Sequence, residues 1–367
     1  MESLITIFRE VEDPRDINAR HDLGSMLFVS LVATLCGAKS CVDIADFAET
    51  HMDTLSEIVD LRHGAPSHDC FSRLFRLLDP TELNQALMRF TAALRQALGL
   101  GPARGVVAID GKSLRRGFEQ GRAYMPPLMI SVWDAETRLS ISSRHAEGGD
   151  EIKATLAALK SLVLKGCIVT ADALHCHPRM AEAVRASGAH YALGLKSNHG
   201  PLYAAAGAAL AKAEAAGTLV IDECSEKGHG RGDTRRVAVV AKPAEAPDFP
   251  GLVAIARIEA ERRNAKGKID TALRYIALSK RLSPARVLEV TRAHWSVEND
   301  LHWQLDVVFR EDDARTRKNY APQNLAVIRR IALDILRHHP AEKSIARKMK
   351  LAAWSMPFLF ELFTHMR

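Results

Sequence analysis

The segment from Gly105 to about residue 200 constrains the fold most, because strand and helix patterns alternate along it in one particular order. Apolar, β-branched runs predict strands, and apolar residues spaced three and four apart predict amphipathic helices. In chain order these are strands at 106–110, 128–134 and 139–146, a helix at 151–163, a strand at 167–173, a helix at 177–188 and a strand at 190–196. This β-β-β-α-β-α-β order predicts an α/β fold with a mixed sheet flanked by helices.

Two aspartates stand where strands of this predicted sheet end. Asp110 follows the apolar run VVAI, and Asp172 ends the run CIVTA. An isolated aspartate at a strand end is more often a turn former or a helix cap than a ligand. The first and fourth strands are expected to be neighbours, however, so the two carboxylates would converge. Two close carboxylates repel each other unless a cation neutralises them, and oxygen ligands suit Mg²⁺, or Mn²⁺ in its place.

A third acid for such a site is Glu298, within a helical pattern that covers about 283–309. On one continuous helix, Glu298, His302 and Asp306 fall on one face. The residues expected to pack beside them are Trp295, Leu301, Leu305 and Val308. Asp306, Glu311 and Asp312 are alternatives to Glu298, because position on a helix alone does not distinguish these acids.

The remaining chain divides by pattern into further segments. Residues 1–100 read as helices throughout and predict a helical N-terminal domain. Residues 201–280 hold an alanine-rich helix and then short strands, which predicts a β-rich inserted subdomain. The core would therefore comprise 105–200 and 281–340, and 341–367 would form a helical C-terminal tail.

Charge and cysteine usage narrow the class of protein. There are 50 Lys and Arg against 44 Asp and Glu, a net charge of +6, which fits a polyanionic partner without requiring one. The six cysteines include no CxxC pair, so we expect reduced thiols rather than a disulfide framework. No apolar run reaches the roughly 18 residues that span a bilayer. These features predict a cytoplasmic protein without membrane association.

Several motifs together are similar to one family, the insertion-sequence transposases of the ISAs-one type, also called H-repeat-associated proteins, within the IS-four-like DDE group. The matching segments are DPR and HDL at 13–15 and 21–23, PSHDCFSRLF at 66–75, AIDGKSLR at 108–115, DEI at 150–152, IVTADALHC at 168–176, YALGLKSN at 191–198, GHGRGDTR at 228–235 and HWSVENDLHWQLDVVFRED at 294–312. They cover nearly the whole chain in order. The usual glutamines near 177 and 199 are histidines here, which leaves the three acids intact.

The resemblance implies an RNase H-like catalytic core with Asp110, Asp172 and Glu298 as catalytic and metal-binding acids. It also implies two Mg²⁺ ions per site, cleavage at the terminal inverted repeats of a mobile element, joining to target DNA, a homo-oligomer assembled on DNA and a DNA-binding N-terminal region. The residues expected to contact DNA are Lys112, Arg115, Arg116, Lys196, His229, Arg231, Arg235, Arg292 and His302. The alternative functions are an RNase H-like structure-specific nuclease and an inactive DNA-binding remnant.

Overall fold

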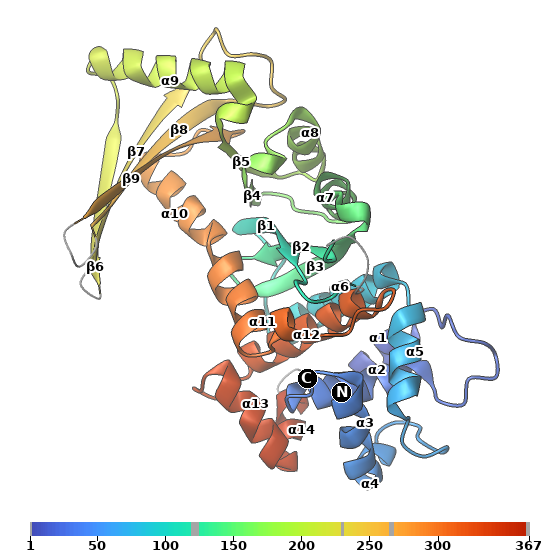
Figure 1. Cartoon of the computed structure of the whole chain (residues 1–367). Helices are drawn as coiled ribbons and strands as arrows, with labels where there is room; N and C mark the ends of the chain where they lie inside the picture. Colours follow the sequence, from blue (N-terminus) through green and yellow to red (C-terminus); the bar gives the residue numbers. More distant parts are fainter. Residues whose placement is uncertain (1, 119–124, 229–230, 264–267, 365–367) are drawn as a thin grey trace.

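The structure is a computed structural model that describes residues 2–118, 125–228, 231–263 and 268–364 (Figure 1). Its centre is one nine-stranded sheet with the strand order β3-β2-β1-β4-β5-β9-β8-β7-β6. The strands of the first half are β1 (Val106–Ser113), β2 (Leu128–Asp134), β3 (Leu139–Ala146), β4 (Ile168–Ala171) and β5 (His190–Leu195). The strand patterns read from the sequence are confirmed in this half.

Strand directions identify the core. The three strands β1, β2 and β3 are antiparallel neighbours, whereas β4 lies parallel to β1 and β5 parallel to β4. A mixed five-stranded sheet of this order and direction, covered by helices on both faces, is the RNase H-like architecture. The predicted fold class is therefore confirmed.

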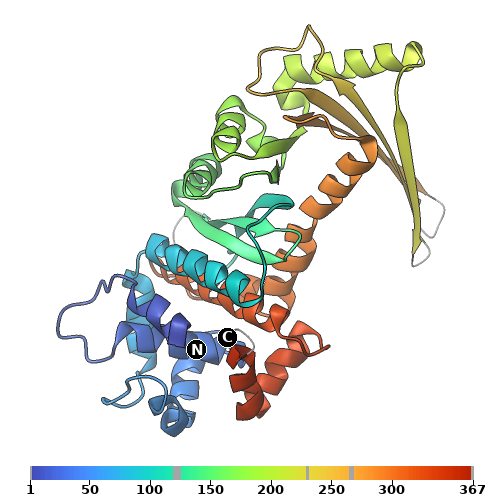
Figure 2. The ribbon, with the colours of Figure 1, turned by 180° about the vertical axis from the view of Figure 1, so that it is seen from behind.

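The strands after residue 220 continue this sheet instead of forming a separate one. They are β6 (Ile221–Gly228), β7 (Arg231–Ala241), β8 (Ala254–Arg263) and β9 (Ile269–Leu278). Strand β9 pairs antiparallel with β5, from Ala192 opposite Leu278 to Leu195 opposite Tyr275. This pairing covers the edge of β5, whose backbone groups would otherwise be unpaired. The β-rich segment expected at 201–280 is thus present as an extension that projects from the core (Figures 1 and 2).

The two faces of β1 contact different helices, because alternate residues of a strand point to opposite sides. Val107 and Ile109 pack in one core with α7 (Glu151–Lys160) and α8 (Pro178–Ala186). Helix α9 (Gly200–Ala215) covers the same face over the extension. Val106 and Ala108 point the other way, toward cores that include residues of α10 (Pro284–His294) and α12 (Ala321–His338).

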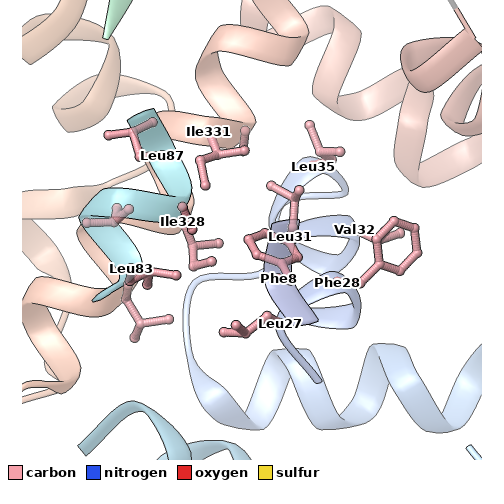
Figure 3. Close-up of a cluster of buried hydrophobic side chains, with 14 of the residues drawn as sticks. Phe8, Leu27, Phe28, Leu31, Val32, Leu35, Leu83, Leu87, Ile328 and Ile331 are labelled. Carbon is pink, nitrogen blue, oxygen red and sulfur yellow. The ribbon is translucent and has the colours of Figure 1, made fainter. Parts of the chain in front are cut away.

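The N-terminal helices share a core with α12. They are α1 (Glu2–Arg9), α2 (Leu23–Leu35), α3 (Cys41–Thr50), α4 (Met52–Ser56), α5 (His68–Leu77) and α6 (Pro80–Ala97). Ile328 and Ile331 of α12 lie among leucines of α2 and α6 (Figure 3). The short helices α13 (Ile345–Trp354) and α14 (Met356–Thr364) close the chain against this core. No helix in the described ranges is long and apolar enough to cross a membrane.

The helix predicted at 283–309 is not continuous, which corrects the expectation from the sequence. Helix α10 ends at His294, a π-helical turn η4 (Val297–His302) follows, and α11 (Trp303–Val307) completes the segment. Leu301 and Leu305 are buried as expected. Trp295 is instead 37% exposed, and Val308 is only partly buried. A wider π turn changes the angle between successive side chains, so the packing stripe expected for an α-helix does not hold across it.

Candidate active site

Asp110 and Asp172 lie on the same face of two adjacent parallel strands. In the ladder between β1 and β4, Ala108 is opposite Thr170, and each aspartate comes two residues later. A step of two residues preserves the face of a strand, so both positions share the face of Ala108 and Thr170. Asp172 follows the last residue of β4, and its carboxylate accepts a hydrogen bond from the Leu174 N–H at 2.9 Å.

Glu298 reaches this face from the π-helical turn. Its neighbours Val297 and Leu301 are fully buried, and the Ser296 hydroxyl accepts a hydrogen bond from the Trp133 indole at 2.9 Å. Upstream, Thr170 Oγ1 lies 3.0 Å from His294 Nδ1, which fixes the end of α10 beside β4. These contacts leave Glu298 exposed while its turn is held against the sheet.

The charges of several acids act on Asp110. Burial is the largest of the effects that raise the pKa of Asp110 to about 7, and the negative charges of Glu298, Asp172 and Glu151 raise it further, while the Gly111 N–H lowers it. A carboxyl group with three acidic neighbours is a site where a cation is favoured. In the described part of the chain, no group of three or more His, Cys, Asp or Glu side chains is already arranged to hold a metal ion.

His302, expected from the sequence to contact DNA, lies against Asp110. Its Nδ1 is 3.4 Å from Asp110 Oδ2, and its side chain is 12% exposed. Burial lowers the pKa of His302 to about 3, and the positive charges of Arg330 and Lys112 act in the same direction. The neutral imidazole therefore lies against the Asp110 carboxylate and presents little surface to a ligand.

Lys112 is likewise not placed to contact DNA as expected. Its ammonium group is 7% exposed and lies 2.6 Å from Asp306 and 3.2 Å from Asp312. Lys112 comes two residues after Asp110, so its side chain points to the same face of β1 as Asp110 does. On that face it contacts Asp306 of α11 and Asp312 of η5 (Glu311–Asp313). Lys112 therefore joins β1 to the segment after Glu298.

The other residues expected to contact DNA are spread over the surface. Arg115 and Arg116 follow β1 and are 72% and 51% exposed, and Lys196 is exposed after β5. Arg235 lies 3.5 Å from Asp233 on β7, and Arg292 donates to the Cys224 thiol. His229 lies outside the described residues, and the side chain of Arg231 is also outside them.

A glutamate and a histidine that the sequence did not single out as site residues lie beside Asp110. Glu151, the first residue of α7, approaches Gly111 so closely that a Cβ there would meet its Oε1 at 2.7 Å. His175 Nε2 lies 3.1 Å from the same oxygen, and its side chain is 1% exposed. The DEI motif at 150–152 was the available signal, but only the fold brings it to β1.

The fold and the acids define a class of protein, the RNase H-like enzymes that cut and join nucleic acid strands. A family model described as Transposase DDE domain matches residues 101–335, and one described as DDE_Tnp_1-associated matches residues 5–91. The chain belongs to this DDE transposase family, whose members are metal-dependent enzymes that cleave and transfer DNA strands.

Two relatives that align over most of their own length and most of this chain agree with this assignment. The protein named YbfL of Escherichia coli K12 is 32% identical over 92% of this chain and 91% of its own length. The "H repeat-associated putative transposase YhhI" of the same strain gives the same values. A chain of a piggyBac transposase synaptic complex with hairpin DNA aligns with 99% of this chain and 78% of its own, at TM-score 0.39 and 11% identity. The two family models and the two Escherichia coli relatives confirm the expected family.

Proposed function

We propose that this DDE transposase cuts the ends of a mobile element and joins them to target DNA, with Asp110, Asp172 and Glu298 holding divalent ions. The observation that carries the proposal is the position of Asp110 and Asp172 on the same face of the adjacent parallel strands β1 and β4. Glu298 lies close enough for its charge to act on Asp110. Carboxylate oxygens are the ligands that Mg²⁺ prefers, and a pair of such ions polarises both the attacking and the leaving oxygen of a phosphodiester.

Glu298 is favoured as the third acid because the alternatives have other partners. Asp306 and Asp312 neutralise the buried Lys112. Glu311 is 1% exposed and lies 3.6 Å from Arg329 and 3.4 Å from Arg330. An acid already paired with buried cations is a poor ligand for a further ion. Glu298 is exposed and acts on Asp110 through its charge.

Within this proposal the surrounding residues position the acids. His302 orients Asp110, and the Glu151–His175 pair supports the opposite side of β1. We further infer that the protein acts as a homo-oligomer that pairs two element ends, and that the helices of residues 1–100 bind the terminal repeats.

The test is strand cleavage on a duplex that carries the inverted repeat flanking the gene. Wild-type protein with Mg²⁺ should nick the duplex at the element end, and Asp172→Asn should cut at least about a thousandfold more slowly, because one metal ligand is lost. Binding of the variant to the same duplex should stay at the wild-type level. Equal cleavage of branched duplexes that lack the repeat would instead indicate a structure-specific nuclease.

Metal binding is measured separately by calorimetric titration of Mn²⁺ into the protein without DNA. Wild type should bind the ion, whereas Asp110→Asn and Glu298→Gln should each bind it more weakly. Asp306→Asn provides the comparison, since Asp306 is assigned to Lys112. If Asp306→Asn lost Mn²⁺ binding and Glu298→Gln kept it, the assignment of the third acid would be wrong.

A further inference from the structure

We propose that two loops beside the acids form a second DNA contact, which binds the phosphate backbone several nucleotides away from the bond that is cut. This surface, here named the basic rim, consists of Arg115, Arg116, Arg315, Arg317 and Lys318. The proposal rests on the proposed function and deepens it, because it assigns a substrate contact to the segment between η5 (Glu311–Asp313) and α12.

The two loops of the basic rim lie against each other. Arg317 Nε donates to the carbonyl oxygen of Arg116 at 3.1 Å, and Arg115 Nε lies 3.2 Å from Asp312 Oδ2. Leu114 and Gly117 on one side and Ala314 and Thr316 on the other line a narrow cleft between them. Cations distant in sequence are therefore gathered in one place.

The basic rim holds more cations than acids, and two of its cations have an acid beside them: Arg115 lies 3.2 Å from Asp312, and Arg116 lies 3.9 Å from Asp313. The only acids on the described parts of the two loops are Glu311, Asp312 and Asp313, and each has a cation beyond the rim: Arg329 and Arg330, Lys112, and Arg310, respectively. Arg315 and Lys318 are exposed, and no ion pair to either is found among the described residues. With five cations and three acids, the two loops carry a net charge of five minus three, or +2.

The rim is fixed relative to Asp110 by buried ion pairs. Lys112 ties β1 to Asp306 and Asp312 at the start of the second loop. Glu311, fully buried, ties the same loop to Arg329 and Arg330 of α12. A cationic surface held this way requires little ordering when it binds a ligand.

The distance along β1 sets which phosphates would be bound. Arg115 follows Asp110 by five residues, at most about 16 Å along an extended chain. One DNA strand carries a phosphate about every 3.4 Å of helix axis, so Arg115 would bind a phosphate within about five nucleotides of the scissile bond. Guanidinium groups suit this partner, since their paired N–H donors match phosphate oxygens.

The first experiment measures DNA affinity against salt for the double variant Arg315→Ala and Lys318→Ala. The probe is a fluorescein-labelled duplex that carries the element end and its flank. Loss of two phosphate contacts should lower the slope of log affinity against log salt by about two and weaken binding about tenfold at low salt. The matched control is Arg347→Ala with Lys350→Ala, an equal charge change on exposed positions of α13. A slope equal to wild type, or an equal loss in the control, would overturn the proposal.

The second experiment locates the contact by replacing single phosphates of the probe with neutral methylphosphonates, in the cleavage-deficient Asp172→Asn background. Replacements up to about five nucleotides from the cut should weaken DNA binding by the protein that keeps Arg315 and Lys318. The same replacements should not weaken DNA binding by the double variant. If sensitivity at those phosphates persists in the double variant, the rim does not bind them. An acidic protein partner would leave the whole scan unchanged, which also contradicts the proposal.

The outcomes separate this inference from the proposed function. If wild type cleaves and the double variant binds and cleaves equally well, the basic rim fails while the transposase proposal stands. If wild type fails to cleave with Mg²⁺ while the double variant still loses its salt slope, the proposed activity fails and the DNA contact stands. Thermal unfolding of each variant confirms that the fold is intact.

Discussion

At the scale of single residues, Asp334 of α12 is a buried acid. Among the described residues, no cationic side chain donates a hydrogen bond to its carboxyl group. It is fully buried and accepts a hydrogen bond from the Ser140 N–H at 3.1 Å. Burial raises its pKa to about 6, although the charges of Arg337 and His338 and the bonds from Ser140 oppose the shift. Folding therefore favours the protonated form of Asp334 relative to the unfolded chain, where the value is 3.8.

We expect Asp334→Asn to remove this pH dependence. Between pH 3.8 and about 6 the folded wild type binds the extra proton, so its stability relative to the variant falls as pH rises, by about 3 kcal/mol, and is constant above that window. Urea unfolding of both proteins across this range measures the difference. Asp248→Asn, at a fully exposed acid, should show no such trend; a relative stability that rose with pH would contradict the assignment.

How far the candidate site could be predicted also depends on the residue. Asp110 and Asp172 were predictable because strand ends are visible in the hydrophobic pattern. Glu298 needed the family resemblance, since helical position did not separate it from Asp306. Lys112 and His302 were misjudged because a basic residue beside an acid looks the same in a sequence whether it faces solvent or a buried partner.

At the scale of elements, α12 holds the N-terminal helices through polar contacts as well as apolar ones. Asn324 is fully buried, and its amide donates to the carbonyl oxygens of Phe75 at 2.9 Å and Leu78 at 2.7 Å. These carbonyls lie at the end of α5, where a helix has no partners of its own for its last C=O groups.

Replacing Asn324 with alanine should therefore destabilise the protein by about 2 to 3 kcal/mol, because two buried carbonyl groups lose their donor. The free energy of unfolding in urea measures the change. Gln96→Ala, at an exposed amide in α6, should shift it by less than about 0.5 kcal/mol. Equal effects of the two substitutions would mean that the Asn324 contacts contribute nothing.

The sequence predicts most helices and strands, but it does not predict which strands pair with each other. Alternation and apolar runs identified the strands from β1 to β9. The pairing of β9 with β5 joins residues about 80 apart, and no local pattern encodes it. The π turn likewise depends on burying Val297 and Leu301 against the sheet while leaving Glu298 exposed.

At the scale of the whole molecule, the N-terminal helices and the catalytic segment share one hydrophobic core. Residues from α1, α2 and α6 pack with Ile331 of α12 and with Trp133 of β2, all fully or nearly fully buried. A core that crosses the boundary near residue 100 should couple the unfolding of the two parts.

We expect Ile331→Ala to lower the stability of the entire chain by about 2 to 5 kcal/mol in a single transition, because the cavity lies in the shared core. Three of the four tryptophans, Trp133, Trp295 and Trp303, lie within residues 105–340, so fluorescence reports mainly the catalytic part, while far-ultraviolet circular dichroism also reports the N-terminal helices. The two signals should change together in urea. Separate midpoints would show that residues 1–100 unfold independently.

The continuous nine-stranded sheet has a mechanical consequence. Nine strands joined by backbone hydrogen bonds resist bending as a unit, and in the described residues the register of the ladder is regular from β6 to β2, with a shift only between β2 and β3 at Val132 and Trp133. A load applied to the outer hairpins would thus be transmitted through β9 and β5 as torque on β4, the strand that ends at Asp172. A force that bends the projecting strands would therefore also act on the strand that positions Asp172.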